Sequence, residues 1–374
     1  MSGSGPSFEL RGTELRSTGL RGTPLPIVMI GAGGIVRNAH LPAYRKGGLP
    51  VAAIVDRHQE RAQALAAEWG IGIRGATLAA VLPQLRGDLI FDIAVPAAAL
   101  LEVLAAIPGG SLVLIQKPLG GTLAEAEAIV ALCRARGLRA AVNFQLRWAP
   151  NMVAARAITD AGALGRLHDI EVQLSTHTPW ELWSFLKTAP RLEIVYHSIH
   201  YVDLVRSWLG NPQRVYARTV RNPGTPELAA TKSVIVMDYD EWTRVFIATN
   251  HGLDVPYPEL QHSYVQWEGT EGVMRAQMGV NLDYPKGRGD TLEFYPRQPH
   301  AGFAAGAQQV SGDWFPDAFL GSMLSVQRFA LGESATMPTR VEDALDTMRV
   351  VEAAYLSSER GGEPLSLALL ETTQ

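Results

Sequence analysis

The sequence predicts an α/β protein of two domains: an N-terminal doubly wound parallel sheet, then an α+β domain with an open, mainly antiparallel sheet. Three observations support this prediction. At 374 residues, the chain is too long for one ordinary hydrophobic core. Its first half alternates short apolar runs with amphipathic, alanine-rich stretches, as strand-helix repeats do. Its second half carries longer runs in which apolar and polar residues alternate, as in a sheet with one free face.

The composition excludes several classes of protein. Apolar residues make up 47% of the chain and charged residues 19%, which is typical of a globular protein. The formal net charge of -4 gives no attraction toward nucleic acid, so we expect no nucleic-acid partner. No stretch reaches the roughly 18 apolar residues of a membrane helix, and the single cysteine, Cys133, cannot form an intramolecular disulfide. We therefore expect a cytoplasmic protein with no membrane partner.

The first domain is expected over residues 25–147. Residues 1–24, rich in Gly, Ser, Thr and Arg without periodicity, predict a disordered leader. Short apolar runs, each followed by turn or polar residues, then predict buried strands at 27–30, 51–55, 89–95, 112–115 and 140–144.

The second domain is expected over residues 148–374. Helices are predicted from about 151 and over 196–209, the latter ended by Gly210. Period-two alternation predicts strands at 214–220, 232–239, 243–251 and 263–268, and helical periodicity returns at 319–329 and 341–357. Because no repeat or low-complexity linker separates the halves, we expect the domains to meet at a crevice.

A glycine motif directly follows the first predicted strand, with Gly31, Gly33 and Gly34 in the turn and Ile35 opening the helical stretch. Glycines here let the backbone approach a pyrophosphate, whose charge is held by free amides and the helix N-terminus. Val36 stands where a third glycine is common, a position that affects helix-strand packing more than ligand contact. The order of elements predicts a Rossmann dinucleotide site rather than an unrelated glycine turn.

Asp56 closes the second predicted strand, where a carboxylate is expected to bind the adenosine ribose hydroxyls. It would repel a 2′-phosphate, which favours NAD over NADP. The adjacent Arg57 weakens this argument, because a guanidinium can pair with that phosphate or stack on adenine. NADP therefore stays possible.

Further motifs extend from Ile27 to about Leu367. They are Gly31 to His40 with Leu41-Pro42, Val95-Pro96, Gln116-Lys117-Pro118, Arg147 with Pro150, Gly165-Arg166, His200 with Asp203 and Gly210, and Glu352 to Ser358. Together and in this order they resemble the family of glucose-fructose oxidoreductase, inositol dehydrogenase and the rhizopine-catabolism oxidoreductases, often abbreviated Gfo/Idh/MocA. The resemblance implies a Rossmann domain, with Val95 and Pro96 at the cofactor, and an open-faced sheet domain that takes part in oligomerisation. It therefore implies a homodimer or homotetramer.

Lys117 matches the lysine of the family's Glu-Lys-Pro signature, which implies a role in catalysis and substrate binding. It also follows a predicted strand at the carboxyl edge of the sheet, where an ammonium can polarise a substrate oxygen and relay its proton. The alternative is a solvated loop lysine. Gln116 departs from the family's glutamate; its amide can still bond the nicotinamide ribose, but it cannot pair ionically with Lys117.

His200 matches a histidine that the family places beside the reacting carbon, which implies that it binds substrate and transfers a proton. The family has an aspartate four residues earlier, where this chain has Tyr196. Spacings of four and three put Tyr196, His200 and Asp203 on one helical face, so Asp203 could orient the imidazole. Tyr196 is either a proton-transferring phenol or an aromatic core contact.

Arg147 resembles the family's arginine at the domain junction, where its guanidinium could clamp a substrate oxygen pair or form a structural ion pair. Trp180 and Trp183 could stack on a sugar ring, although core or rim packing explains them as well. No recognisable set of metal ligands occurs, and we expect no metal.

These features predict an NAD(P)-dependent dehydrogenase or reductase that transfers a hydride between nicotinamide and a hydroxyl or keto carbon of a sugar, inositol or related polyol. Two alternatives remain. The departures at Gln116 and Tyr196 would suit a non-catalytic NAD-binding regulatory protein. An NAD-dependent glycosidase would reduce and regenerate its cofactor within one cycle, with no net NADH.

Overall fold

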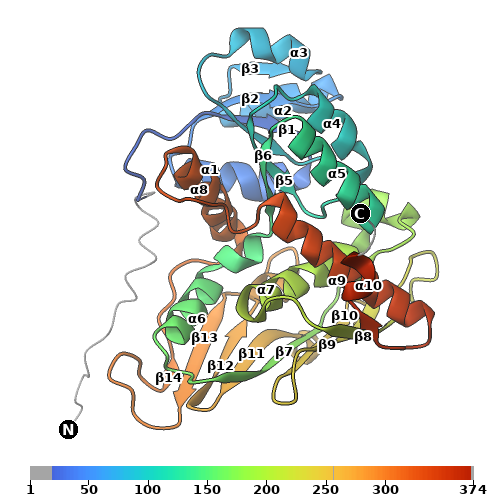
Figure 1. Ribbon diagram of the computed structural model, residues 1–374. Helices are drawn as coiled ribbons and strands as arrows, with labels where there is room; N and C mark the ends of the chain where they lie inside the picture. Colours follow the sequence, from blue (N-terminus) through green and yellow to red (C-terminus); the bar gives the residue numbers. More distant parts are fainter. Residues whose placement is uncertain (1–18, 256, 372–374) are drawn as a thin grey trace. The chain divides into compact units, whose positions relative to one another are not determined.

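The computed structural model describes residues 19–255 and 257–371, which form two compact units (Figure 1). Of the described residues, the N-terminal unit holds 19–145 and a later segment, Phe315–Glu352; the second unit holds Leu146–Trp314 and residues 353–371. Residues 1–18, most of the expected leader, lie outside the described residues. No helix of the described part of the chain is long and apolar enough to span a membrane.

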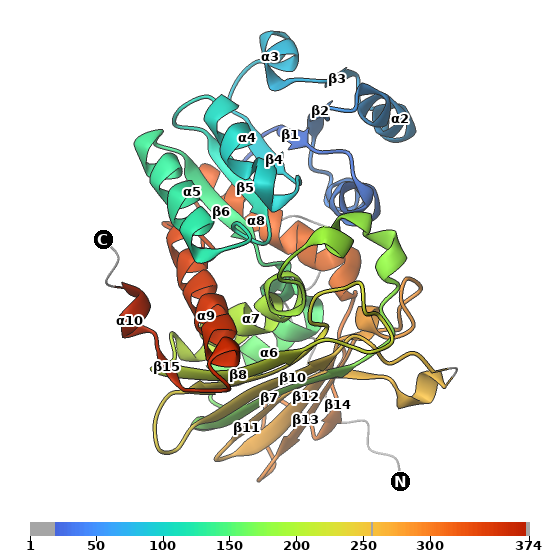
Figure 2. The ribbon, with the colours of Figure 1, turned by 90° about the vertical axis from the view of Figure 1, so that its right-hand side faces the viewer.

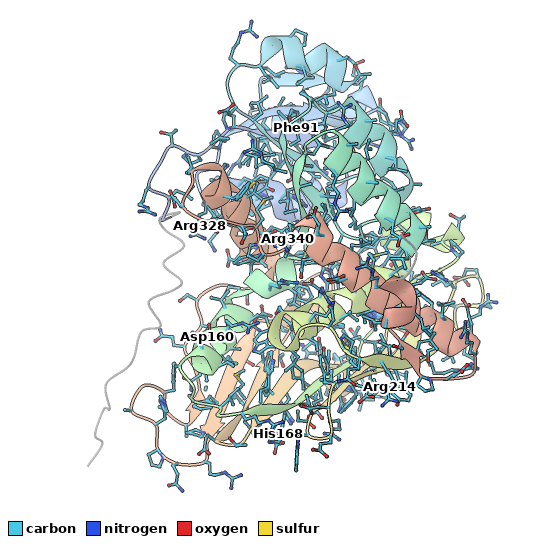
Figure 3. The ribbon with its side chains drawn as sticks, in the orientation of Figure 1. Phe91, Asp160, His168, Arg214, Arg328 and Arg340 are labelled. Carbon is cyan, nitrogen blue, oxygen red and sulfur yellow. The ribbon has the colours of Figure 1, made fainter. Side chains whose placement is uncertain are left out.

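The N-terminal unit is built on a parallel sheet of six strands in the order β3-β2-β1-β4-β5-β6. The strands are β1 (Ile27–Ile30), β2 (Val51–Val55), β3 (Ile73–Gly75), β4 (Ile90–Ile93), β5 (Leu112–Gln116) and β6 (Arg139–Asn143). They are largely buried on both faces, as Phe91 of β4, labelled in Figure 3, illustrates at 2% exposure. The predicted doubly wound parallel sheet is confirmed, because the strand order reverses at β1 and β4.

Helices cover this sheet and join its strands. They are α1 (Leu41–Lys46), α2 (Gln59–Trp69), α3 (Leu78–Val81), α4 (Leu100–Ala106) and α5 (Leu123–Ala135), with short turns η1 (Val36–His40), η2 (Leu82–Gln84) and η3 (Ala97–Ala99). A helix from far along the sequence, α8 (Phe319–Ala330), contacts β5 and β6 and lies beside α1 (Figure 1). Its Phe319 and Met323 share a core with Ile27 and Tyr44. The N-terminal unit therefore needs this distant segment to close its core.

The second unit contains a nine-stranded sheet in the order β14-β13-β12-β11-β7-β10-β9-β8-β15. Its strands are β7 (Leu167–Ser175), β8 (Arg214–Val220), β9 (Lys232–Asp238), β10 (Arg244–Asn250), β11 (His262–Gly269), β12 (Gly272–Gln277), β13 (Thr291–Pro296), β14 (Gly306–Ala307) and β15 (Leu365–Ser366). Within the described residues of this nine-stranded sheet, β7 pairs with β10 in parallel and the other pairings are antiparallel. The predicted open, mainly antiparallel sheet is confirmed.

One face of this sheet is covered by helices α6 (Pro150–Asp160) and α7 (Ile199–Leu209) (Figure 2). Burial alternates along the strands, so Trp267 of β11 is fully buried while its neighbour Glu268 is exposed. The shorter elements of the unit are η4 (Gln145–Trp148), η5 (Trp180–Leu182), η6 (Ser184–Thr188), η7 (Ile194–Ser198), η8 (Pro258–Leu260), η9 (Gly279–Asn281) and α10 (Ala368–Glu371). A further π-helical turn, η10 (Trp314–Ala318), begins where the chain returns to the N-terminal unit.

The end of the long helix α9 (Val341–Glu359) protects strand β8 near the edge of the sheet. The hydroxyl of Ser357 accepts a hydrogen bond from the N–H of Ala217 at 2.9 Å, and that of Ser358 accepts one from Thr219 at 3.0 Å. Strand β15 pairs with the other end of β8. Backbone donors that an edge strand would otherwise expose are thus satisfied.

Candidate active site

The glycine loop after β1 has the geometry of an anion-binding turn. Gly31 has φ of 108°, and a Cβ there would lie 2.3 Å from the carbonyl oxygen of Ala94, so only glycine fits. A Cβ at Gly33 or Gly34 would meet no atom within 4 Å, so the space above the loop is open. Ile35 then caps the π-helical turn η1. These residues fit the close backbone approach that a dinucleotide pyrophosphate requires.

Asp56 follows β2 and binds this loop directly. Its Oδ2 accepts the N–H of Ala32 at 2.8 Å, and its Oδ1 accepts the N–H of His58 at 2.8 Å. The carboxylate therefore lies beside the glycine loop with its orientation fixed by two backbone amides. Arg57 next to it is exposed.

Gln116 and Lys117 lie at the end of β5. The Gln116 side chain is buried, and its Oε1 accepts the backbone N–H of Lys117 at 2.9 Å. Lys117 is partly buried and precedes a cis peptide bond to Pro118. Burial lowers the pKa of Lys117 to about 8, which brings its amine within reach of general-base chemistry near neutral pH.

The parallel sheet brings the predicted cofactor residues together at one edge. Strands β1, β4 and β5 are neighbours, so the segments after their carboxyl ends share that edge. These segments hold the glycine loop, Val95 with Pro96, and Gln116 with Lys117. A nicotinamide dinucleotide therefore fits the residues that the N-terminal unit presents.

In the second unit, Arg147 and Asp203 form a bidentate ion pair. Nε of Arg147 lies 2.6 Å from Oδ2 of Asp203, and its Nη2 lies 2.6 Å from Oδ1. The Asp203 side chain is 1% exposed, and a buried carboxylate needs such a partner. The pair joins η4 to α7 and favours a structural role for Arg147; a role in substrate binding stays a prediction.

His200 and Tyr196 lie one turn apart where η7 continues into α7. His200 is 7% exposed, and its ring meets Trp314 edge to face with centroids 5.7 Å apart. Tyr196 packs against a buried apolar cluster that includes Trp180, and its ring lies 6.0 Å from that of Phe185. This packing is what the core-contact alternative expects. Catalytic roles for both residues stay predictions.

The two tryptophans have different surroundings. Trp180 is 7% exposed and meets the rings of His197 and His251 edge to face, so it is a core residue. Trp183 is partly exposed and lies against Tyr284, with ring centroids 5.4 Å apart.

Two buried polar groups were not foreseen from the sequence. In the second unit, Glu193 accepts a hydrogen bond from Ser198 at 2.7 Å and lies 3.5 Å from Nε2 of His251. Burial alone would raise the pKa of Glu193, but hydrogen bonding and the charge of His251 lower it overall. In the N-terminal unit, His40 pairs with Asp92 beneath Gln116. Both groups could have been suspected from the sequence, because Asp92 and Glu193 each stand within a run of apolar residues. A carboxylate in such a run is rarely buried without a partner.

Among the residues that the structure describes, no group of three or more His, Cys, Asp or Glu side chains is placed to hold a metal ion.

Comparisons with known proteins identify the chain's relatives. Residues 25–144 match the model of the GFO/IDH/MocA oxidoreductase family with its NAD-binding Rossmann fold, and residues 152–275 match the model of the GFO/IDH/MocA C-terminal domain. D-apiose dehydrogenase from Paraburkholderia graminis is 28% identical over 355 residues, which cover 92% of this chain and 90% of the relative. D-xylose 1-dehydrogenase (NADP+) 2 from Haloferax volcanii is 26% identical over 342 residues, which cover 89% and 97%.

The fold also occurs in solved structures. An oxidoreductase from Agrobacterium radiobacter, crystallised with NAD+, L-tartaric acid and magnesium, superposes with a TM-score of 0.75. It is 23% identical, and the match covers 93% of this chain and all of that chain, so it supports the fold alone.

Fold, glycine loop and matched models define an NAD(P)-dependent oxidoreductase. More particularly, the chain belongs to the GFO/IDH/MocA family, as the resemblance in the sequence implied.

Proposed function

We propose that this protein oxidises a hydroxyl carbon of an aldose or a closely related sugar, with NAD+ as the hydride acceptor. The observation that carries the proposal is the partly buried Lys117, with its lowered pKa, at the carboxyl edge of the parallel sheet, the edge that also carries the glycine loop. The substrate class is supported by three relatives, two D-apiose dehydrogenases and a D-xylose dehydrogenase.

Lys117 is proposed as the proton-transfer group. In its neutral form the amine accepts the proton of the sugar hydroxyl while hydride leaves the same carbon, which becomes a carbonyl. The bound nicotinamide supplies the hydride acceptor. His200 is the second proton-transfer candidate, and Tyr196 a third whose packing gives it less freedom.

Cofactor choice is proposed to favour NAD over NADP. The two backbone amides that hold Asp56 keep its negative charge beside the glycine loop, where it would oppose a 2′-phosphate. Both cofactors should be tested, because Arg57 is exposed and one relative is an NADP-dependent D-xylose dehydrogenase.

The proposal is tested by incubating the full chain with either cofactor and a panel of aldoses that contains D-apiose and D-xylose, with inositols and sugar acids for comparison. We expect NADH formation with at least one aldose. Formation with an inositol or a sugar acid alone would overturn the aldose assignment. Tight NAD binding without turnover on any panel member would favour a regulatory protein.

We further propose a cytoplasmic homodimer or homotetramer assembled through the outer face of the nine-stranded sheet. Val234 and Val236 on β9 are 48% and 36% exposed, and Tyr295 on β13 is 51% exposed. Such apolar side chains on a helix-free sheet face suit a partner of the same kind. A monomer in light scattering would contradict the assembly. The cytoplasmic location is supported by the lone cysteine, which is buried and needs no oxidising compartment.

A further inference from the structure

Beneath the end of β5, the N-terminal unit buries a carboxylate, an imidazole and a phenol. Asp92 and His40 are fully buried, and Tyr44 is 1% exposed. Nδ1 of His40 lies 2.7 Å from Oδ2 of Asp92, and the hydroxyl of Tyr44 donates to the same oxygen. Burial and the nearby Asp92 charge raise the pKa of Tyr44 well above its ordinary value, so the phenol keeps the proton that it donates.

This group reaches the active-site edge through Gln116. Nε2 of His40 lies 3.5 Å from Nε2 of Gln116, and Oε1 of Gln116 accepts the backbone N–H of Lys117 at 2.9 Å. Because an ionised Asp92 can only accept, Nδ1 of His40 must carry the ring proton. Nε2 then presents a lone pair, which accepts an N–H of the Gln116 amide. Three bonds therefore point one way, from Lys117 through Gln116 and His40 to Asp92, and the fourth, from the Tyr44 hydroxyl, ends on the same carboxylate oxygen.

We propose that His40, Asp92 and Tyr44 are positioning residues for the reaction, which fix the Gln116 carboxamide in one orientation and so hold the backbone of Lys117. The inference rests on the proposed role of Lys117. A carboxamide has two N–H donors and two oxygen lone pairs. In Gln116, one N–H bonds to His40 and one oxygen lone pair accepts the N–H of Lys117. The other N–H and the other lone pair remain for hydroxyl groups of a bound nucleotide.

The arrangement explains why glutamine rather than glutamate suits position 116. A carboxylate there could accept the Lys117 N–H but could donate nothing to Nε2 of His40. The imidazole would then need protons on both nitrogens to face two carboxylates. Gln116 and a singly protonated His40 are thus a matched pair.

The decisive variant is His40→Asn. Its amide nitrogen can take the place of Nδ1 and donate to Asp92, while the group that accepts from Gln116 is lost. We expect turnover to fall about 10- to 100-fold, as for a misplaced catalytic group, with little change in the sugar KM or in the melting temperature. The matched control is Cys133→Ala, a buried substitution on α5 of the same unit; it should keep the wild-type rate.

A double-mutant cycle shows whether His40 acts through Gln116. The His40→Asn/Gln116→Ala double variant should be no slower than Gln116→Ala alone, because the second change removes the group that the first one positions. Additive losses would overturn the proposal, as would a His40→Asn enzyme with wild-type turnover.

A readout without catalysis separates this inference from the proposed function. Nitrogen NMR of the imidazole should show a proton on Nδ1 alone in the wild type and on both nitrogens in Gln116→Glu. A proton on Nε2 alone in the wild type would refute the positioning scheme, even if His40→Asn failed to fold. If instead the NMR result holds and Lys117→Ala is fully active, the proposed function fails.

Discussion

At the scale of single residues, the surroundings of Lys117 and Gln116 at the end of β5 decide their chemistry: burial lowers the pKa of the lysine, and His40 lies beside the glutamine amide. Lys117 could be picked out from its motif and its place after a strand, but the burial that lowers its pKa to about 8 required the structure. The same holds for Gln116. Its departure from the family's glutamate could be seen in the sequence, whereas the partner that makes glutamine suitable, His40, lies 76 positions away.

The pH dependence of Lys117 gives the first prediction. A general base must be neutral before it takes a proton, so oxidation should speed up as pH rises through about 8, the pKa of the buried amine. The reverse reaction needs the ammonium and should slow over the same range. Lys117→Ala should lower turnover by about two orders of magnitude or more and flatten this limb, with dinucleotide binding largely kept.

Steady-state rates across pH check this prediction, with Lys286→Ala as a control because Lys286 is an exposed lysine of the second unit. A Lys117→Ala enzyme with the wild-type rate, or an unchanged pH profile in that variant, would remove the lysine from the mechanism.

Asp56 gives a prediction about cofactor choice. The wild type should bind NAD more tightly than NADP, and Asp56→Ser should narrow or reverse that ratio. Serine also gives up one of the two amide bonds from Ala32 and His58, so NAD binding itself should weaken. Asp56→Asn tests the effect of the charge alone on this ratio, because it keeps the size of the side chain. Calorimetric titration of both cofactors measures the ratio, and a wild-type preference for NADP would disprove the assignment.

Tyr196 separates catalysis from packing. The Tyr196 ring packs against the Trp180 cluster and Phe185. Tyr196→Phe keeps this packing and should be stable, whereas Tyr196→Ala removes it and should lose about 2 to 4 kcal/mol of unfolding free energy. If the phenol transfers a proton, the Phe variant should instead lose turnover while keeping its stability. Thermal melts and rates measured together decide between the roles, and a fully active Phe variant leaves Lys117 and His200 as the working groups.

At the scale of elements, periodic stretches of the sequence predicted strands where the structure has them. The expected runs at 214–220 and 27–30 coincide with β8 (Arg214–Val220) and β1 (Ile27–Ile30). The three-residue strand β3 was missed because Ile73–Gly75 is too short to show a pattern. Strand β7 was missed although its burial alternates, because residues such as His168 and Asp169 dilute the apolar signal. The return of α8 to the N-terminal unit depends on long-range packing, which no local pattern encodes.

Ser357 and Ser358 at the end of α9 accept hydrogen bonds from the backbone of β8, and we call this pair the serine clamp. Its contribution to stability can be tested by mutation. Ser357→Ala leaves the buried N–H of Ala217 without its acceptor, which should cost about 1 to 3 kcal/mol of unfolding free energy. Ser325→Ala is the matched control, because its buried hydroxyl donates to the Ser322 carbonyl of its own helix and no backbone donor depends on it. Urea unfolding measures both. Equal losses in the two variants would show that the clamp adds nothing specific to β8.

At the scale of the whole molecule, fold class and cofactor class were predictable because their signals are local: a glycine turn after a strand, an acidic residue after the next strand, and a change from buried to alternating strands. The sugar was not predictable. Substrate choice depends on the shape that side chains give to a binding site, and residue identities alone do not define that shape. The D-apiose and D-xylose dehydrogenases among the relatives are the reason for testing a panel of aldoses.

Isotope tracing follows the proposed hydride transfer from a sugar carbon to nicotinamide. The aldose that supports turnover is supplied with deuterium on the carbon to be oxidised, and the reduced cofactor is analysed by mass spectrometry. We expect one deuterium in every reduced nicotinamide and a carbonyl product that has lost its label. Reduced cofactor without deuterium, or a product that keeps its deuterium, would contradict it.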